Sequence, residues 1–162
     1  MEDAHIPQLS RQEIDAFLSR AASSPRRRVP KILHEPGDVL NRVVNFMMQD
    51  SYMQPHLHPG EEKIEKIFLI EGRIAVLMFD DRGAVKDLVM LEDGKVEYVE
   101  IPAFTWHTYV MLSAHAVSYE TMMGRYEPET WKEFAEWAPS EGSPESVTYR
   151  DVLKAEAVKR VA

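Results

Sequence analysis

Two histidines one residue apart, His56 and His58, open the stretch QPHLHPGEEKIEKIFLIEG. In an extended strand the side chains of residues i and i+2 leave the same face, so two imidazoles at this spacing can bind one metal ion. Three glutamates follow within a few residues, and the apolar run behind them ends at Gly72. The stretch therefore combines the nitrogen and oxygen donors of a metal site with a segment able to hold them.

A third imidazole lies far along the chain, where His107 follows a proline turn in VEIPAFTWHTYVML. A β-barrel brings such distant strands together, and three imidazoles with one carboxylate would then converge inside it. Two glutamates of the EEKIE run are candidates for the carboxylate. Glu65 would share a strand face with Ile67 and Leu69, whereas Glu62 would lie in the preceding loop. We favour Glu65 and keep Glu62 as the alternative.

The overall composition limits what such a site can serve. The chain has 162 residues, enough for one domain with a substantial core, and its lack of cysteine excludes disulfides and sulfur-ligated zinc. The net charge of -8 argues against a nucleic-acid partner, because binding a phosphate backbone requires a basic surface. The sequence shows neither an apolar run long enough for a membrane span nor a secretory signal, so we expect a cytoplasmic protein.

A short amphipathic helix is predicted before the strands begin. Ser10 followed by Glu13 is the pattern of a capping box at a helix start. Ile14, Phe17 and Leu18 then form one apolar stripe at helical spacing. The Ser-Ser-Pro sequence behind this stripe ends the helix.

Short apolar segments separated by turn signals fill the middle of the chain. They read RVVNFMMQ, KIFLIE, RIAVLMFD, AVKDLVML, VEYVEI, WHTYVML and AVSYETMM, a pattern typical of an all-β sandwich or barrel. Helical texture returns in PETWKEFAEWAP and VTYRDVLKAEAVKR, where Trp131, Phe134 and Trp137 would pack on the barrel. We expect one domain in three parts: an N-terminal helical segment over residues 1–28, a β-barrel over 29–124 and a C-terminal helical extension over 125–162.

The segment RIAVLMF is apolar on both faces of its expected strand. One face would line the barrel, and the other would need a helix or a partner chain to cover it. Because the terminal helices are short, we expect the cover to come from a second copy in a homodimer.

Two motifs in this order resemble the paired motifs of the cupin superfamily. The first motif is His-x-His, then Glu, six residues and Gly, and the second is Pro-x-Gly-x-x-His. The matching residues are His56, His58, Glu65 and Gly72, then Pro102 and His107. The gap before Glu65 is longer than usual, so the loop carrying Gly60 should bulge. Phe104 replaces the turn glycine of the second motif, and because a bulky residue takes positive φ only with strain, we expect a different turn in which Phe104 walls the pocket mouth.

More narrowly, SPRRRVPKILHEPGD, YMQPHLHP, EGRIAVLMFDDRG, IPAFTWHT, SYETMMGRYEPE and KEFAEWAPSEG resemble the WbuC family of small cupin metalloproteins, over roughly residues 15–142. The resemblance implies a mainly β protein, the cupin double-stranded β-helix or jelly-roll barrel, with short N- and C-terminal α-helices. It also implies a bound metal ion. The family is often associated with bacterial surface-polysaccharide genes and has no settled reaction.

Three imidazoles and a carboxylate suit one divalent first-row ion, Fe, Mn, Co, Ni or Zn, and leave coordination positions for water or substrate. One class of function that follows is a metal-dependent isomerase, epimerase or lyase acting on a small sugar or organic acid. The other is a metal-containing binding or sensor domain that recognises a small molecule without turning it over. An Fe(II)-dependent dioxygenase would use the same ligands.

Further residues are expected around the bound small molecule, which the sequence suggests is anionic. Arginine forms bidentate hydrogen bonds to phosphate and carboxylate, so Arg26 and Arg28 of the three consecutive arginines, with His34 and Arg42, are candidates to hold its charged end. Glu120, on an expected strand, is a candidate for a carboxyl buried near the metal.

Overall fold

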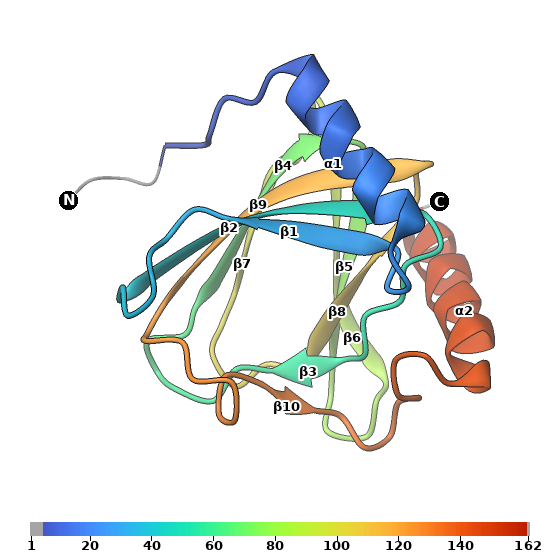
Figure 1. Cartoon of the computed structure of the whole chain (residues 1–162). Helices are drawn as coiled ribbons and strands as arrows, with labels where there is room; N and C mark the ends of the chain where they lie inside the picture. Colours follow the sequence, from blue (N-terminus) through green and yellow to red (C-terminus); the bar gives the residue numbers. More distant parts are fainter. Residues whose placement is uncertain (1–4, 162) are drawn as a thin grey trace.

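The computed structural model describes residues 5–161 and contains two five-stranded antiparallel sheets with a helix near each end of the chain (Figure 1). Residues 1–4 of the expected N-terminal segment and residue 162 of the expected C-terminal extension lie outside the described residues. The elements are α1 (Arg11–Ser23), β1 (Arg28–Ile32), β2 (Leu40–Met48), β3 (His56–Leu57), β4 (Glu65–Glu71), β5 (Arg73–Phe79), β6 (Val85–Glu92), β7 (Tyr98–Ile101), β8 (His107–Met111), β9 (His115–Met123), β10 (Glu133–Phe134) and α2 (Pro144–Val161).

The two sheets face each other around the main core. One sheet has the order β1-β2-β9-β4-β7 and the other β10-β3-β8-β5-β6. Their inner faces supply one apolar cluster, in which Met47 and Ile67 of the first sheet meet Ile74, Val76 and Leu91 of the second. The mainly β architecture predicted from the short apolar segments is therefore confirmed.

The helix α1 covers the outer face of β2 and β9. Ser10 caps it, because the side-chain oxygen of Ser10 accepts a hydrogen bond from the backbone N–H of Glu13. Ile14 of its apolar stripe is buried, and Phe17 stacks on Phe46 of β2 with ring centroids 4.6 Å apart. The predicted start, stripe and end of this helix are all confirmed.

Strand β5 is buried on both sides within a single chain. Ile74 and Val76 point into the main core, while Ala75 and Leu77 belong to a second apolar cluster with Leu153 of α2. The helix α2 lies along this sheet in Figure 1. The covering helix expected as one possibility is thus present, and the reason for expecting a homodimer, an uncovered outer face of β5, does not hold for the described residues.

The expected helix around PETWKEFAEWAP is wrong. Residues 125–143 form turns and the two-residue strand β10, and the C-terminal helix begins only at Pro144. Trp131 and Phe134 are at helical spacing, but the backbone N–H of Ala135 donates to the carbonyl of Pro55 beside the β10–β3 pairing. A helix of this length has little stability of its own, so strand pairing and burial of Trp131 determine the conformation.

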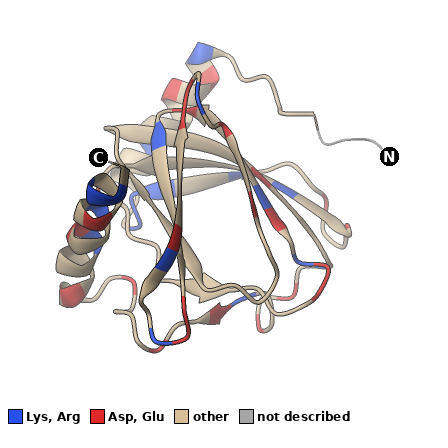
Figure 2. Cartoon of the chain, turned by 180° about the vertical axis from the view of Figure 1, so that it is seen from behind, with Lys and Arg blue, Asp and Glu red and all other residues tan. Residues whose placement is uncertain are grey.

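Lys and Arg residues are interspersed with Asp and Glu residues along α2 and the strands in the view of Figure 2. Neither helix among residues 5–161 combines the length and apolar character needed to cross a bilayer.

Candidate metal centre and its cavity

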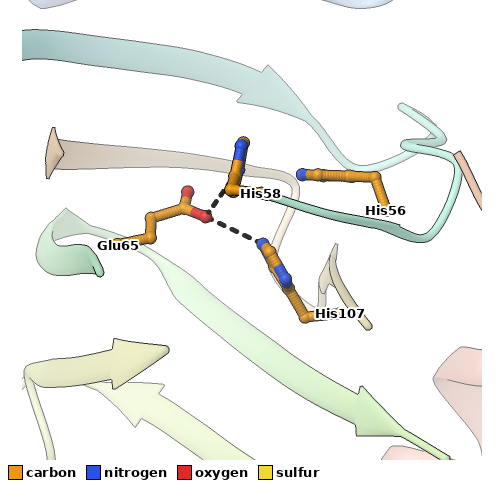
Figure 3. A group of neighbouring side chains, drawn as sticks. All are labelled: His56, His58, Glu65 and His107. Carbon is orange, nitrogen blue, oxygen red and sulfur yellow. Dashed lines mark hydrogen bonds and ion pairs between the residues drawn. The ribbon is translucent and has the colours of Figure 1, made fainter. Parts of the chain in front are cut away.

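Four buried side chains converge at one end of the barrel (Figure 3). His56 of β3 is paired in register with His107 of β8, and His58 follows on the same face of the chain. Glu65, the first residue of β4, reaches them from the opposite sheet. One donor atom from each of the four residues lies within 4.8 Å of the others. Strand alternation explains the pair of imidazoles, and the facing of the two sheets brings in the carboxylate.

Hydrogen bonds to the backbone fix the tautomer of all three imidazoles. Each Nδ1 atom lies 2.8 to 2.9 Å from a backbone carbonyl oxygen, that of Gln54 for His56, Trp131 for His58 and Thr105 for His107. A carbonyl oxygen only accepts, so each Nδ1 carries the hydrogen and each Nε2 is left with its lone pair when the ring is neutral. This is the arrangement in which histidine binds a metal ion through Nε2.

The free lone pairs face a carboxylate. Oε2 of Glu65 lies 2.8 Å from Nε2 of His107 and 3.2 Å from Nε2 of His58. Acceptor atoms come this close only with a proton or a cation between them, so the donor set fits a divalent metal ion.

The pKa values in the cluster follow from the same geometry. Burial would lower the pKa of His107, but the charge of Glu65 outweighs it and raises that pKa. Burial would raise the pKa of Glu65, but His107 and His58 hold it well below its usual value. Burial lowers the pKa of His56 well below its usual value, so its ring is neutral at pH 7.

The turn between His58 and Glu65 decides which glutamate reaches the imidazoles. Gly60 has φ of 142°, and its carbonyl accepts a 2.9 Å hydrogen bond from the backbone N–H of Lys63, so the extra residues are taken up in a tight turn. Glu62 is exposed on that turn. The structure therefore places Glu65, and not Glu62, with the three imidazoles.

The cluster opens into a cavity of about 370 Å³. Of the predicted ligand residues, Arg26, Arg28, His34 and Glu120 line the cavity, whereas Arg42 and Phe104 do not. The cavity wall also includes Asn41, Asn45, Tyr109, Trp131 and Lys132, which sequence reasoning did not assign to a ligand site. Asn41 and Asn45 on one face of a strand, and Tyr109 two residues after His107, were signals that alternation could have used.

The two arginines in the cavity wall are paired with one carboxylate. Arg26 Nε lies 2.7 Å from Glu141 Oε1, and Arg28 Nη2 lies 2.8 Å from Glu141 Oε2. Burial would raise the pKa of Glu141, but the hydrogen bonds from the two guanidinium groups lower it to about 2. These pairs tie the segment 125–143 to the start of β1, and they offset part of the positive charge at the cavity.

Arg42 points away from the cavity. Along β2 the side chains of Asn41, Val43 and Asn45 line the cavity, so Arg42 lies on the opposite face. Its Nε donates a 2.8 Å hydrogen bond to the hydroxyl of Tyr119. The predicted ligand role of Arg42 is therefore corrected by strand alternation.

Phe104 adopts the conformation that its size was expected to prevent. Its φ is 58°, in the left-handed region, and its side chain is 56% exposed. The backbone N–H of Phe104 donates a 3.1 Å hydrogen bond to the carbonyl of His58, which holds this turn beside the cluster. The turn thus keeps the glycine-like shape, and the ring lies outside the cavity wall.

A second carboxyl group lies in the cavity, separate from the cluster. The Tyr109 hydroxyl donates to Oε1 of Glu120, and the Ser118 hydroxyl donates to the same oxygen at 3.2 Å. Burial and the charge of Glu65 raise the pKa of Glu120 to about 7. Both protonation states of Glu120 are therefore accessible near neutral pH.

Residues 9–91 match the protein-family model described as "Domain of unknown function (DUF6016)". That match spans half of the chain. The chain belongs to the DUF6016 family. A comparison of this DUF6016 sequence with curated proteins found no match.

Solved structures similar to this DUF6016 chain include protein SO0799 from Shewanella oneidensis, with a TM-score of 0.55 and 10% identity over 80% of this chain and 84% of that one. CapF from Staphylococcus aureus has a TM-score of 0.54 and 18% identity, covering 66% of this chain and 31% of CapF. A recombinant oxalate oxidase in complex with glycolate has a TM-score of 0.53 and 14% identity, covering 70% and 57%.

The DUF6016 chain thus spans less than two thirds of CapF and of the oxalate oxidase. At these identities the likeness shows the fold alone. CapF and the oxalate oxidase are cupins, so the jelly-roll fold expected from the paired motifs is confirmed.

Proposed function

We propose that this DUF6016 protein is a metal-dependent cupin that binds a small anionic carbohydrate or organic acid. It would act as an isomerase, epimerase or lyase by moving a proton to or from the bound molecule. The observation that carries the proposal is the buried cluster of three inward-facing Nε2 atoms and Glu65, open to a cavity that holds a second carboxyl group, Glu120. His56, His58, Glu65 and His107 are the proposed ligands of one Fe, Mn, Co, Ni or Zn ion.

A role in bacterial surface-polysaccharide metabolism is part of the proposal. The sequence resemblance to the WbuC family supports it. CapF, one of the structurally similar proteins, is a capsular polysaccharide assembling protein. The shared fold does not carry this activity to the present chain by itself, so the substrate class rests on the chemistry of the cavity.

The division of roles follows from the positions of the groups. A bound divalent ion would supply Lewis acidity to an oxygen of the ligand. Glu120 would give or take a proton, because burial, the larger cause, raises its pKa whether or not a metal ion is bound, to about 7 in the metal-free chain. Tyr109 would hold that carboxyl in place through its hydroxyl. A cation beside Glu65 would offset part of the charge that raises the pKa of Glu120, so this pKa falls when the metal binds.

Solvent deuterium exchange tests the proposal. Metal-loaded protein would be incubated in deuterium oxide with a panel of hydroxy acids, sugars and sugar phosphates, and deuterium at carbon would be read by NMR. We expect exchange into at least one compound with the parent protein, and loss of that exchange in Glu120→Gln with metal content unchanged. Glu136→Gln, an equal charge change at an exposed position, is the control and should keep full exchange.

Other outcomes point to the other function classes. Tight binding of a panel compound by metal-loaded protein without any exchange would replace the enzyme by a binding or sensor domain. Consumption of dioxygen by the iron-loaded protein, with no exchange, would indicate a dioxygenase.

A further inference from the structure

Lys132 is a cation in the cavity wall that the proposed function does not use. It lines the cavity together with Trp131. Among the ion pairs formed within residues 5–161, none includes Lys132. A half-buried ammonium without a carboxylate partner is costly, so its placement needs a reason.

Lys132 lies next to a strand that is paired with the strand of His56. Phe134 of β10 is paired in register with His56 of β3, and their rings lie 6.3 Å apart. Lys132 comes directly before β10, and it lines the same cavity as His56 and His58. Its Nζ atom lies 5.6 Å from the Phe134 ring centroid, so the ammonium group is next to the ring that faces His56.

The other cations near the cavity are already engaged. Arg26 and Arg28 share Glu141, and the Nζ atom of Lys63 donates to the carbonyl of Thr130 at 3.1 Å. Burial lowers the pKa of Lys132, as do the charges of Arg28 and Arg26, while Glu65 acts in the opposite sense. An anion placed beside Lys132 would stabilise its charged form.

We propose that Lys132 is the anion anchor of the cavity and binds a carboxylate or phosphate group at one end of a ligand whose other end lies at the cluster of His56, His58, Glu65 and His107. The inference rests on the proposed function for the position of that second end. Lys132 would then bind the anionic group of the ligand, the role that the sequence suggested for Arg26 and Arg28. The ligand class is a small acid with two binding ends, which a cavity of about 370 Å³ accommodates.

Calorimetry with two matched acids tests this anchor. Malate and 2-hydroxybutyrate share the hydroxy-acid end that can meet a metal ion, and only malate has a second carboxylate. We expect metal-loaded parent protein to bind malate about tenfold more tightly than 2-hydroxybutyrate, the scale of one charge-assisted hydrogen bond. In Lys132→Met the preference should fall to about threefold or less, with the affinity for 2-hydroxybutyrate and the metal content unchanged.

Two further variants make the result specific. Lys132→Arg keeps the charge and should keep most of the preference for malate. Lys86→Met removes an equal charge from an exposed position on β6 and should bind both acids as the parent does. A parent protein without preference, or a preference that survives in Lys132→Met, would overturn the assignment.

A metal-independent arm separates this inference from the proposed function. Inorganic phosphate would be titrated into chelator-treated protein and followed by phosphorus NMR. If the protein proves to hold no metal but its phosphate binding is lost in Lys132→Met, the metal proposal fails and the anchor stands. If metal is present and phosphate binding is equal in parent and variant, the anchor fails alone.

Discussion

The proposed metal ligands come from three separate parts of the chain: His56 and His58 at β3, Glu65 in β4 and His107 in β8. The His56 and His58 pair followed from strand alternation, which needs no knowledge of the fold. The choice of Glu65 over Glu62 depended on a turn whose shape no local rule specified. Arg42 was assigned to the wrong face, because alternation fixes which residues share a face but not which face is inward. Lys132 gave no signal, since its segment was read as a helix.

Glu120 should make the stability of metal-free protein fall as pH rises. Its pKa is about 7 in the folded chain against 4.5 as the ordinary value, so the folded state keeps a proton that the unfolded state releases between these pH values. Stability is therefore lost as pH rises from 4.5 through 7. Glu120→Gln cannot titrate and still accepts from Tyr109. In urea unfolding, the free energy of unfolding of the variant relative to the parent should rise by about 2 kcal/mol from pH 5 to pH 8. An advantage that is equal at the two pH values would contradict the assignment.

At the scale of elements, strands were easier to predict than the segment over the cavity. The apolar runs such as KIFLIE and WHTYVML have strand-like composition and clear turns at their ends, and they became β4 and β8. Residues 125–143 carry aromatic residues at helical spacing, but each ring found a different partner. Trp131 lines the cavity and Trp137 packs on Phe79, at a centroid distance of 5.1 Å. Such tertiary contacts are not encoded in local periodicity.

The turn before β8 should be stabilised by Phe104→Gly. For a residue with a side chain, the positive φ at position 104 costs about 1 to 2 kcal/mol of folding free energy. Glycine avoids this strain, but it loses more backbone entropy on folding, which cancels roughly half of the gain. The exposed ring contributes little packing. Thermal or urea unfolding should therefore show a gain of about 0.5 to 1 kcal/mol. Phe104→Ala, which keeps the strained backbone, is the control; a gain of the same size in both variants would refute the explanation.

The apolar strand RIAVLMF was correctly predicted to need cover on both faces, but the expected source of that cover, a second copy of the chain, was not the one found. It required cover on both faces of β5, and the structure provides that cover with α2 of the same chain. Which partner would supply the cover depends on the path of the C-terminal segment. Because residues 125–143 were wrongly predicted to be helical, the position of the helix that follows them could not be predicted.

Removing the contact between α2 and β5 should destabilise the fold without changing metal binding. Leu153 is buried against Leu77 and Phe79, so Leu153→Ala should lower the free energy of unfolding by about 2 to 4 kcal/mol. Val152 is 57% exposed on the same helix, and Val152→Ala should cost less than about 1 kcal/mol. Equal losses in the two variants would show that α2 does not cover this sheet.

Elemental analysis of purified protein shows whether His56, His58, Glu65 and His107 hold one divalent ion. We expect about one first-row ion per chain in the parent and in His5→Ala, an exposed control outside the cluster. His56→Ala and His107→Ala should lose most of the metal while circular dichroism still reports the β-fold, because the apolar clusters of the two sheets include none of the four ligands. Metal content unchanged in both cluster variants would show that these residues do not hold the ion.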